Sequence, residues 1–221
     1  MDKNRKNVGN KRGNGLAGTA GGRFALLASS GETVFHAGDF VNLWHITNKN
    51  TLHTTLSRYV GAGNLFRIYK GLYSVKKAAD IDPHYLALKA VHSFAYISCE
   101  TILFENGIIN QPPPEITLVS SFSKHFRIAG IRARVRKMQD RFLFNDFGVA
   151  TSQGVKRATT PRAIADMLYF HPKKYFDAGN SALIDWNAVQ DVSKRVGYAL
   201  RISTQIIRDN HDSSRQKRRD S

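Results

Sequence analysis

The sequence has 221 residues, with 33 Lys and Arg against 17 Asp and Glu, a formal net charge of +16 and 42% hydrophobic residues. This length and apolar content predict one large or two small globular domains and exclude a wholly disordered chain. A single cysteine, Cys99, excludes an intramolecular disulfide, and no apolar run approaches the ~20 residues of a membrane span. We therefore expect a cytoplasmic protein with an anionic partner, no membrane contact, and no metal or cofactor.

Residues 1–22 predict a disordered basic arm, because they are rich in Gly and Asn and contain few apolar side chains that a core could bury. The arm is expected to contact DNA phosphates, although a solubilising tail is an equally good interpretation. A second polar, basic segment is predicted over residues 208–221. The cationic residues assigned to the arm are Lys3, Arg5, Lys6, Lys11, Arg12 and Arg23.

Residues 23–78 predict a winged helix-turn-helix DNA-binding domain. A short amphipathic segment at its start precedes a second helix, in which Phe40 and Trp44 recur at helical spacing. A third helix follows the turn-forming residues 46–49 and ends at Gly61. The apolar stripe of this third helix consists of Leu52, Leu56, Tyr59 and Val60.

The side of the third helix opposite this stripe predicts a recognition surface for the major groove of DNA. It has no carboxylate, and its hydroxyl, amide and guanidinium groups could reach base edges or phosphates. The alternative is an ordinary solvated helix face. Because threonine is a poor helix former in exposed positions, three threonines in one helix favour function. The residues expected to contact DNA from this helix are Lys49, Asn50, Thr51, His53, Thr54, Ser57 and Arg58.

Two short β-prone runs over residues 65–75 predict a hairpin, with Gly71 able to adopt the positive φ of a tight turn. The hairpin would form the wing and contact phosphates or the minor groove. The residues assigned to its exposed surface are Arg67, Tyr69, Lys70, Tyr73 and Lys76.

Residues 79–207 predict a mixed α/β domain. Helices are expected over 83–91, after Thr160 and after Asp185, with one more near 200–207, and a strand is expected over 115–120. Within residues 126–137, apolar residues alternate with three arginines, which is the pattern of a half-buried strand. These arginines could contact an acidic partner surface, but pairing with Asp140, Asp146 or a glutamate at the surface is the favoured interpretation. They are Arg132, Arg134 and Arg136.

The sequence does not predict an enzyme, because its carboxylates show no spacing that would bring them together at a metal ion. Two alternatives to a DNA-binding repressor stay open. One is a transcription factor whose second domain senses a small ligand, and the other, less favoured, is a metal-dependent nuclease. The carboxylates considered are Glu100, Glu115, Asp140, Asp146, Asp166, Asp177 and Asp185.

The order of several segments between residues 30 and 200 resembles the AbiEi antitoxin family of type IV toxin–antitoxin systems. No single motif carries this resemblance. The segments that match the family's pattern are 56–65, 67–73, 83–90, 96–103, 113–119, 158–168 and 184–186.

The resemblance implies an α+β fold with an N-terminal winged helix-turn-helix domain and a C-terminal antitoxin-type domain. It also implies a function: the protein would bind double-stranded DNA at repeats in its own promoter and repress its operon. The second domain would counteract a nucleotidyltransferase-like toxin encoded beside it, with or without direct contact.

Overall fold

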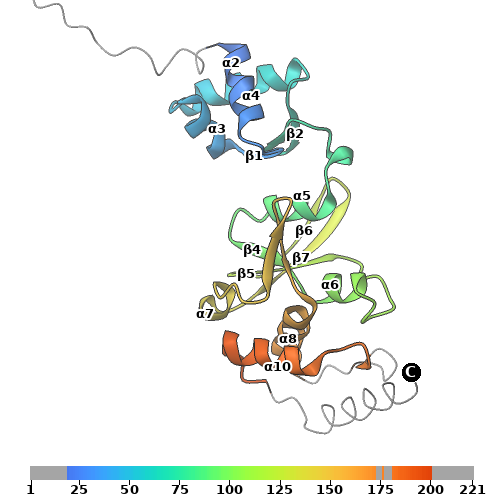
Figure 1. The fold of residues 1–221 in the computed structure, drawn as a ribbon. Coiled ribbons are helices and arrows are strands. Elements are labelled where there is room, and N and C mark those ends of the chain that lie inside the picture. The colour runs from blue at the N-terminus through green and yellow to red at the C-terminus, as the bar shows by residue number, and fades with distance from the viewer. Residues whose placement is uncertain (1–18, 173–175, 177–180, 201–221) are drawn as a thin grey trace, which may run out of the picture. The chain divides into compact units, whose positions relative to one another are not determined.

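The computed structural model describes residues 19–172, 176 and 181–200, and the chain divides into two compact units between Ile81 and Asp82. Both units combine helices with strands, so the fold is mixed α+β (Figure 1). The sequence predicted this division after residue 78. Residues 1–18, the predicted tail over 208–221 and the helix expected near 200–207 lie wholly or largely outside the described residues.

The described part of unit 1 contains three α-helices and three short strands. The elements are α2 (Ala20–Ser29), β1 (Val34–His36), α3 (Ala37–Trp44), α4 (Lys49–Gly61), β2 (Phe66–Tyr69), β3 (Leu72–Ser74) and a 3-10 turn, η1 (Ala78–Asp80). Side chains that precede the helices fix where they begin. Thr19 accepts from the N–H of Gly22 at 3.1 Å, and Asn48 accepts from the N–H groups of Asn50 and Thr51 at 2.9 and 3.1 Å.

Aromatic residues hold the three helices of unit 1 together. The ring centroid of Trp44 lies 4.6 Å from that of Phe40 and 5.0 Å from that of Tyr59. The Trp44 indole N–H donates to the carbonyl of Arg23 at 3.1 Å, and the Tyr59 hydroxyl donates to the carbonyl of Ala20 at 2.8 Å. Helix α2 is therefore fixed to both α3 and α4 by polar tips of buried aromatic rings.

The sheet of unit 1 has three strands in the order β1-β3-β2, with both pairs antiparallel. The sequence predicted only the hairpin formed by β2 and β3. Strand β1, which the prediction missed, pairs Val34, Phe35 and His36 with Ser74, Tyr73 and Leu72. Its three residues are too few to show a periodic pattern, so pairing with β3 defines it as a strand.

Unit 2 contains a mixed sheet and several helices. In chain order its elements are α5 (Pro83–Lys89), β4 (Ala95–Ile97), α6 (Glu100–Glu105), β5 (Ile116–Ser120), β6 (Lys124–Ile128), β7 (Ile131–Lys137), α7 (Asp140–Leu143), β8 (Val149–Ser152), β9 (Val155–Ala158), α8 (Thr160–Phe170) and α10 (Trp186–Val196).

The six strands of unit 2 have the order β6-β7-β5-β4-β9-β8, in which β5 runs parallel to β7 and β4 parallel to β9. The two central strands are covered on both faces: every residue of β4 and nearly every residue of β5 is buried. Helix α5 packs on one face, and α8, with α10 packed against it, lies on the other side of the sheet (Figure 1). Among the described residues, no helix combines the length and apolarity needed to cross a membrane.

A buried ion pair lies in the core of unit 2. Arg162 and Asp166 are one turn apart on α8, and the Arg162 Nε donates to Asp166 Oδ1 at 2.9 Å with both side chains fully buried. The remaining guanidinium N–H groups donate to the carbonyls of Phe142, Asn145 and Phe147 and to the Tyr96 hydroxyl. All five donors of this arginine are therefore satisfied.

Asp166 also accepts hydrogen bonds from three hydroxyl groups. Ser98 donates at 2.7 Å and Tyr96 at 3.0 Å, and the Tyr198 hydroxyl donates to the other carboxylate oxygen. Burial raises the pKa of Tyr96 and Tyr198, and the negative charge of Asp166 raises both further. This network joins β4, α8 and the segment after α10, and it is a structural element of the core.

Candidate nucleic-acid interface

All seven residues predicted to form the recognition surface are exposed on α4. The opposite side of the helix packs inward, where Leu52, Leu56 and Tyr59 are at most 7% exposed. The 13 residues of α4 span about 20 Å, enough to lie along a major groove. The residues on its outward side are Lys49, Asn50, Thr51, His53, Thr54, Ser57 and Arg58.

The threonines of α4 differ in the groups they can offer to a ligand. The Thr55 hydroxyl donates to the carbonyl of Thr51 at 2.8 Å, so it is occupied within the helix. The hydroxyls of Thr51 and Thr54 have no hydrogen-bond partner among the described residues. They are exposed and available to an incoming polar group.

The electrostatic environment of α4 favours an anion. No carboxylate lies on the helix, and residues 19–81 contain seven Lys and Arg against three Asp and Glu. One of the three acids, Asp39, accepts from the N–H of His36 at 2.7 Å and serves as part of the cap of α3. The outward face of α4 therefore carries the charges of Lys49 and Arg58 without an acid on the same element.

The hairpin between β2 and β3 carries exposed cationic side chains. Along β2, Arg67 and Tyr69 are exposed, whereas Phe66 and Ile68, which alternate with them, are partly buried. Lys70 is exposed at the turn, where Gly71 has a φ of 88°, and Lys76 is exposed beyond β3. Partial burial raises the pKa of the Tyr69 phenol above its ordinary value.

Tyr73 does not belong to the exposed surface of the hairpin, where the sequence analysis placed it. Its side chain is 6% exposed, and its ring packs edge-on against Phe40 with a centroid separation of 5.7 Å. The prediction failed because it treated β3 as one strand of a two-stranded hairpin. Strand β3 is the central strand, all three of its residues are buried, and Phe40 of α3 covers the Tyr73 ring.

Arg23 does not belong to the basic arm either. It lies inside α2, and its guanidinium carbon is 5.9 Å from the centroid of the Trp44 ring. Helix α2 begins at Ala20, inside the segment predicted to be disordered, because Thr19 caps it and Tyr59 binds its first carbonyl. The arm residues outside the described part of the chain are Lys3, Arg5, Lys6, Lys11 and Arg12.

The arginine pattern on β7 divides into two parts. Arg132 and Arg134 are exposed as predicted, but Arg136 is 6% exposed and forms an ion pair with Glu100. Its guanidinium also lies 5.3 Å from the ring centroid of Phe170. A partner could not reach Arg136, because Glu100 at the start of α6 and the end of α8 cover this part of the sheet.

Four of the carboxylates considered for metal-dependent chemistry have other partners, and one of them, Glu100, pairs with Arg136. Glu115 pairs with His125 at 3.2 Å, Asp166 pairs with Arg162, and Asp185 caps α10 by accepting from the N–H of Ala188. Within the described ranges, no three His, Cys, Asp or Glu residues lie close enough to hold a metal ion. Asp177 lies outside these ranges.

Comparisons with known proteins give no match: no protein-family model matches the chain, and neither does any curated protein. What the α4 surface can bind is therefore inferred from its own side chains. They are exposed, carry hydrogen-bonding groups with two cationic side chains, and include no acid.

Proposed function

We propose that unit 1 binds double-stranded DNA as a winged helix-turn-helix domain. Helix α4 enters the major groove, and Arg67, Lys70 and Lys76 of the wing contact phosphates. The basic residues of the N-terminal arm add further phosphate contacts, which need no fixed geometry.

The outward face of α4 is the observation that carries this proposal. Thr51, Thr54, Ser57 and Arg58 are exposed, and the hydroxyls of the two threonines lack a partner among the described residues. A solvated helix face would gain more from strong helix formers and from acid–base pairs along the helix. Five of the seven residues on this face are weak helix formers, no acid is present to pair with Lys49 or Arg58, and its groups suit base edges and phosphates.

We further propose that the protein represses its own operon and acts as the antitoxin of a type IV toxin–antitoxin system. The order in which several segments occur along the sequence resembles the AbiEi family, and this resemblance supports the proposal. Repression would follow from occupancy, because a domain bound to repeats in the promoter excludes RNA polymerase. Unit 2 would counteract a nucleotidyltransferase-like toxin encoded in the same operon.

The DNA-binding proposal is tested with the full chain and a labelled duplex containing the promoter upstream of its own gene. Arg58→Ala, and separately Thr51→Ala combined with Thr54→Ala, should weaken specific binding by about 1–3 kcal/mol for each lost base contact. Lys194→Ala is the matched control, because it removes one exposed positive charge from unit 2.

Affinity is measured by fluorescence anisotropy on the promoter and on a duplex of scrambled sequence. The expected result is preferential binding to the promoter that the α4 variants lose and the control retains. Equal binding of both duplexes by the unmodified protein, or unchanged promoter binding by both α4 variants, would contradict the proposal.

The antitoxin proposal needs a separate test in cells. The nucleotidyltransferase-like gene expected beside this one should arrest growth when expressed alone, and co-expression of this protein should restore growth. An Arg58→Ala protein should still restore growth, because antitoxicity is assigned to unit 2. Growth arrest that persists with well-expressed protein would contradict the antitoxin role and leave DNA binding untouched.

A ligand-responsive transcription factor is the second candidate, and one pocket of unit 2 bears on it. The pocket has a volume of about 490 Å³ and is lined largely by apolar groups, including Phe142, Leu168 and Tyr169. Two of its polar side chains are bonded to each other, because the Arg141 Nε donates to Gln139 Oε1 at 3.0 Å. Few polar groups are left to orient a small molecule there, so this candidate stays second.

A further inference from the structure

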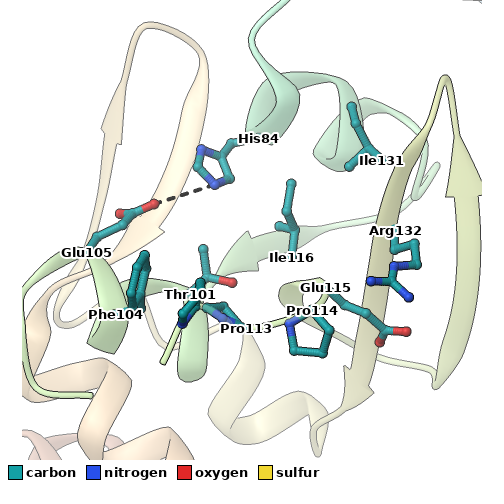
Figure 2. Close-up of a pocket in the computed structure, with 11 residues that line it drawn as sticks. His84, Thr101, Phe104, Glu105, Pro113, Pro114, Glu115, Ile116, Ile131 and Arg132 are labelled. Atoms are coloured by element: carbon teal, nitrogen blue, oxygen red, sulfur yellow. Dashed lines mark ion pairs between the residues drawn. The ribbon is translucent and has the colours of Figure 1, made fainter. Parts of the chain in front are cut away.

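A second pocket of unit 2 lies between α5, α6 and the first residues of β5 and β7. It has a volume of about 370 Å³, and Figure 2 shows the side chains that surround it. Much of its lining is apolar and comes from Phe104, the prolines at 112–114, Ile116 and Ile131. Phe104 at the end of α6 is 38% exposed, which is unusual for a phenylalanine in a folded domain.

The acidic groups at this pocket are engaged in ion pairs. His84 Nε2 lies 3.4 Å from Glu105 Oε1, as Figure 2 shows, and Arg157 pairs with the same carboxylate. On the other side, Glu115 pairs with His125. Carboxylates therefore border the pocket on two sides, Glu105 beside Arg157 and His84 and Glu115 beside His125.

Arginines on the adjacent hairpin of β6 and β7 have no such partners. Arg127 lies directly across from Arg132, and His125 across from Arg134, so all four side chains project from one face of the sheet. Arg127, Arg132 and Arg134 are exposed, and none has an ion-pair partner among the described residues. Arg132 also lines the pocket.

Like charges directly opposite each other on neighbouring strands destabilise a sheet. Arg127 and Arg132 have this arrangement. Arg136, farther along β7, differs from them because it forms an ion pair with Glu100. Arg127, Arg132 and Arg134 can therefore bind carboxylates of another molecule, because a guanidinium group binds a carboxylate in bidentate geometry.

We propose that this surface binds an acidic peptide segment of a protein partner. An apolar side chain of the segment fills the pocket beside Phe104, and its flanking carboxylates pair with Arg127, Arg132 and Arg134. A polypeptide fits better than a nucleic acid, because Glu105 and Glu115 border the pocket and would repel a continuous phosphate backbone. A peptide can present acids to the arginines alone.

The test uses the full chain and a display library of random decapeptides. Selection should enrich peptides in which acidic residues flank an aliphatic or aromatic side chain. Replacing Arg127, Arg132 and Arg134 together by alanine should weaken a selected peptide at least tenfold and flatten the salt dependence of its binding. Phe104→Ser should weaken binding while leaving the salt dependence unchanged.

The matched control replaces Lys137, Lys156 and Lys194 by alanine, which removes the same charge from exposed positions that do not line the pocket. This control should bind the peptide within twofold of the unmodified protein. Selection without enrichment of acidic residues, or equal losses in the arginine and lysine variants, would overturn the proposal. Competition by an oligouridylate as effective as the unlabelled peptide would also overturn it and assign the surface to nucleic acid.

This inference does not depend on DNA binding by unit 1. An Arg58→Ala protein should bind the selected peptide with unchanged affinity, and the triple arginine variant should bind promoter DNA normally. The proposal for peptide binding and the proposal for DNA binding can therefore be contradicted independently of each other.

Discussion

Arg162 and Asp166 on α8 form an ion pair in which neither side chain is exposed to solvent. The same helix spacing occurs on α10, where Asp191 and Arg195 pair at 3.0 Å with about half of each side chain exposed. The two pairs consist of the same two residue types at the same separation, in opposite order along the helix, and they differ strongly in burial. A comparison of the two therefore bears on the effect of burial on an ion pair.

Asp166→Asn should destabilise unit 2 by about 3–5 kcal/mol, because it leaves a buried guanidinium without its counter-charge. Asp191→Asn should cost less than about 1 kcal/mol, since water solvates the remaining arginine. Urea unfolding followed by circular dichroism gives both free energies. Equal destabilisation by the two variants would show that burial of the α8 pair does not govern its contribution.

Unfolding at alkaline pH should depend on Tyr198. Burial, and next the charge of Asp166, raise the pKa of its phenol above the ordinary value of 10.0. The unfolded chain therefore releases this proton near pH 10 while the folded protein keeps it. The contribution of the group is present below that pH and is lost as the pH rises above it.

Tyr198→Phe should accordingly reduce the loss of stability between about pH 9 and pH 11. A residual slope is expected, because Tyr96 lies in the same network with a raised pKa. The measurement is a series of urea unfolding curves across this range. A variant whose curve runs parallel to that of the unmodified protein would exclude Tyr198 as a source of the alkaline transition.

Substitutions of the neighbouring residues Arg58 and Tyr59 on α4 should have different effects, one on DNA binding and the other on the stability of unit 1. Tyr59→Phe removes the hydroxyl that donates to Ala20 and should cost about 0.5–1.5 kcal/mol of unit 1 stability. Arg58→Ala should weaken promoter binding. It should change the free energy of unfolding of unit 1 by no more than about 0.5 kcal/mol, because the Arg58 side chain is exposed. Thermal unfolding and anisotropy on the same samples test this division, and a large stability loss in Arg58→Ala would refute it.

Deleting residues 2–18 should weaken DNA binding on promoter and scrambled duplexes alike and reduce its salt dependence. The five basic residues of this segment are expected to contact phosphates, whose neutralisation releases counterions. The deletion spares Thr19 and Ala20, which cap α2 and bind Tyr59. A loss confined to the promoter duplex would show instead that the arm reads sequence.

The sequence predicted most of the helices, because their signals are local, but it missed the short helices α6 and α7. The apolar stripe of α4, the cap at Asn48 and the polar outward face lie within one helix and its preceding turn. In the same way, Thr160 and Asp185 occur at the starts of α8 and α10. The exposed recognition residues could therefore be placed on a surface from periodicity alone, whereas their binding to DNA stays a prediction.

Only the tertiary structure decided which polar and aromatic residues are buried. The sequence predicted Tyr73 and Arg136 to be exposed, because only their alternation along a strand is visible in it. Segments elsewhere in the chain cover them: Phe40 of α3 packs on Tyr73, and α6 brings Glu100 to Arg136. The network around Arg162 likewise joins residues from 96 to 198. Local patterns fix the period of an element, and long-range packing decides which of its faces meets water.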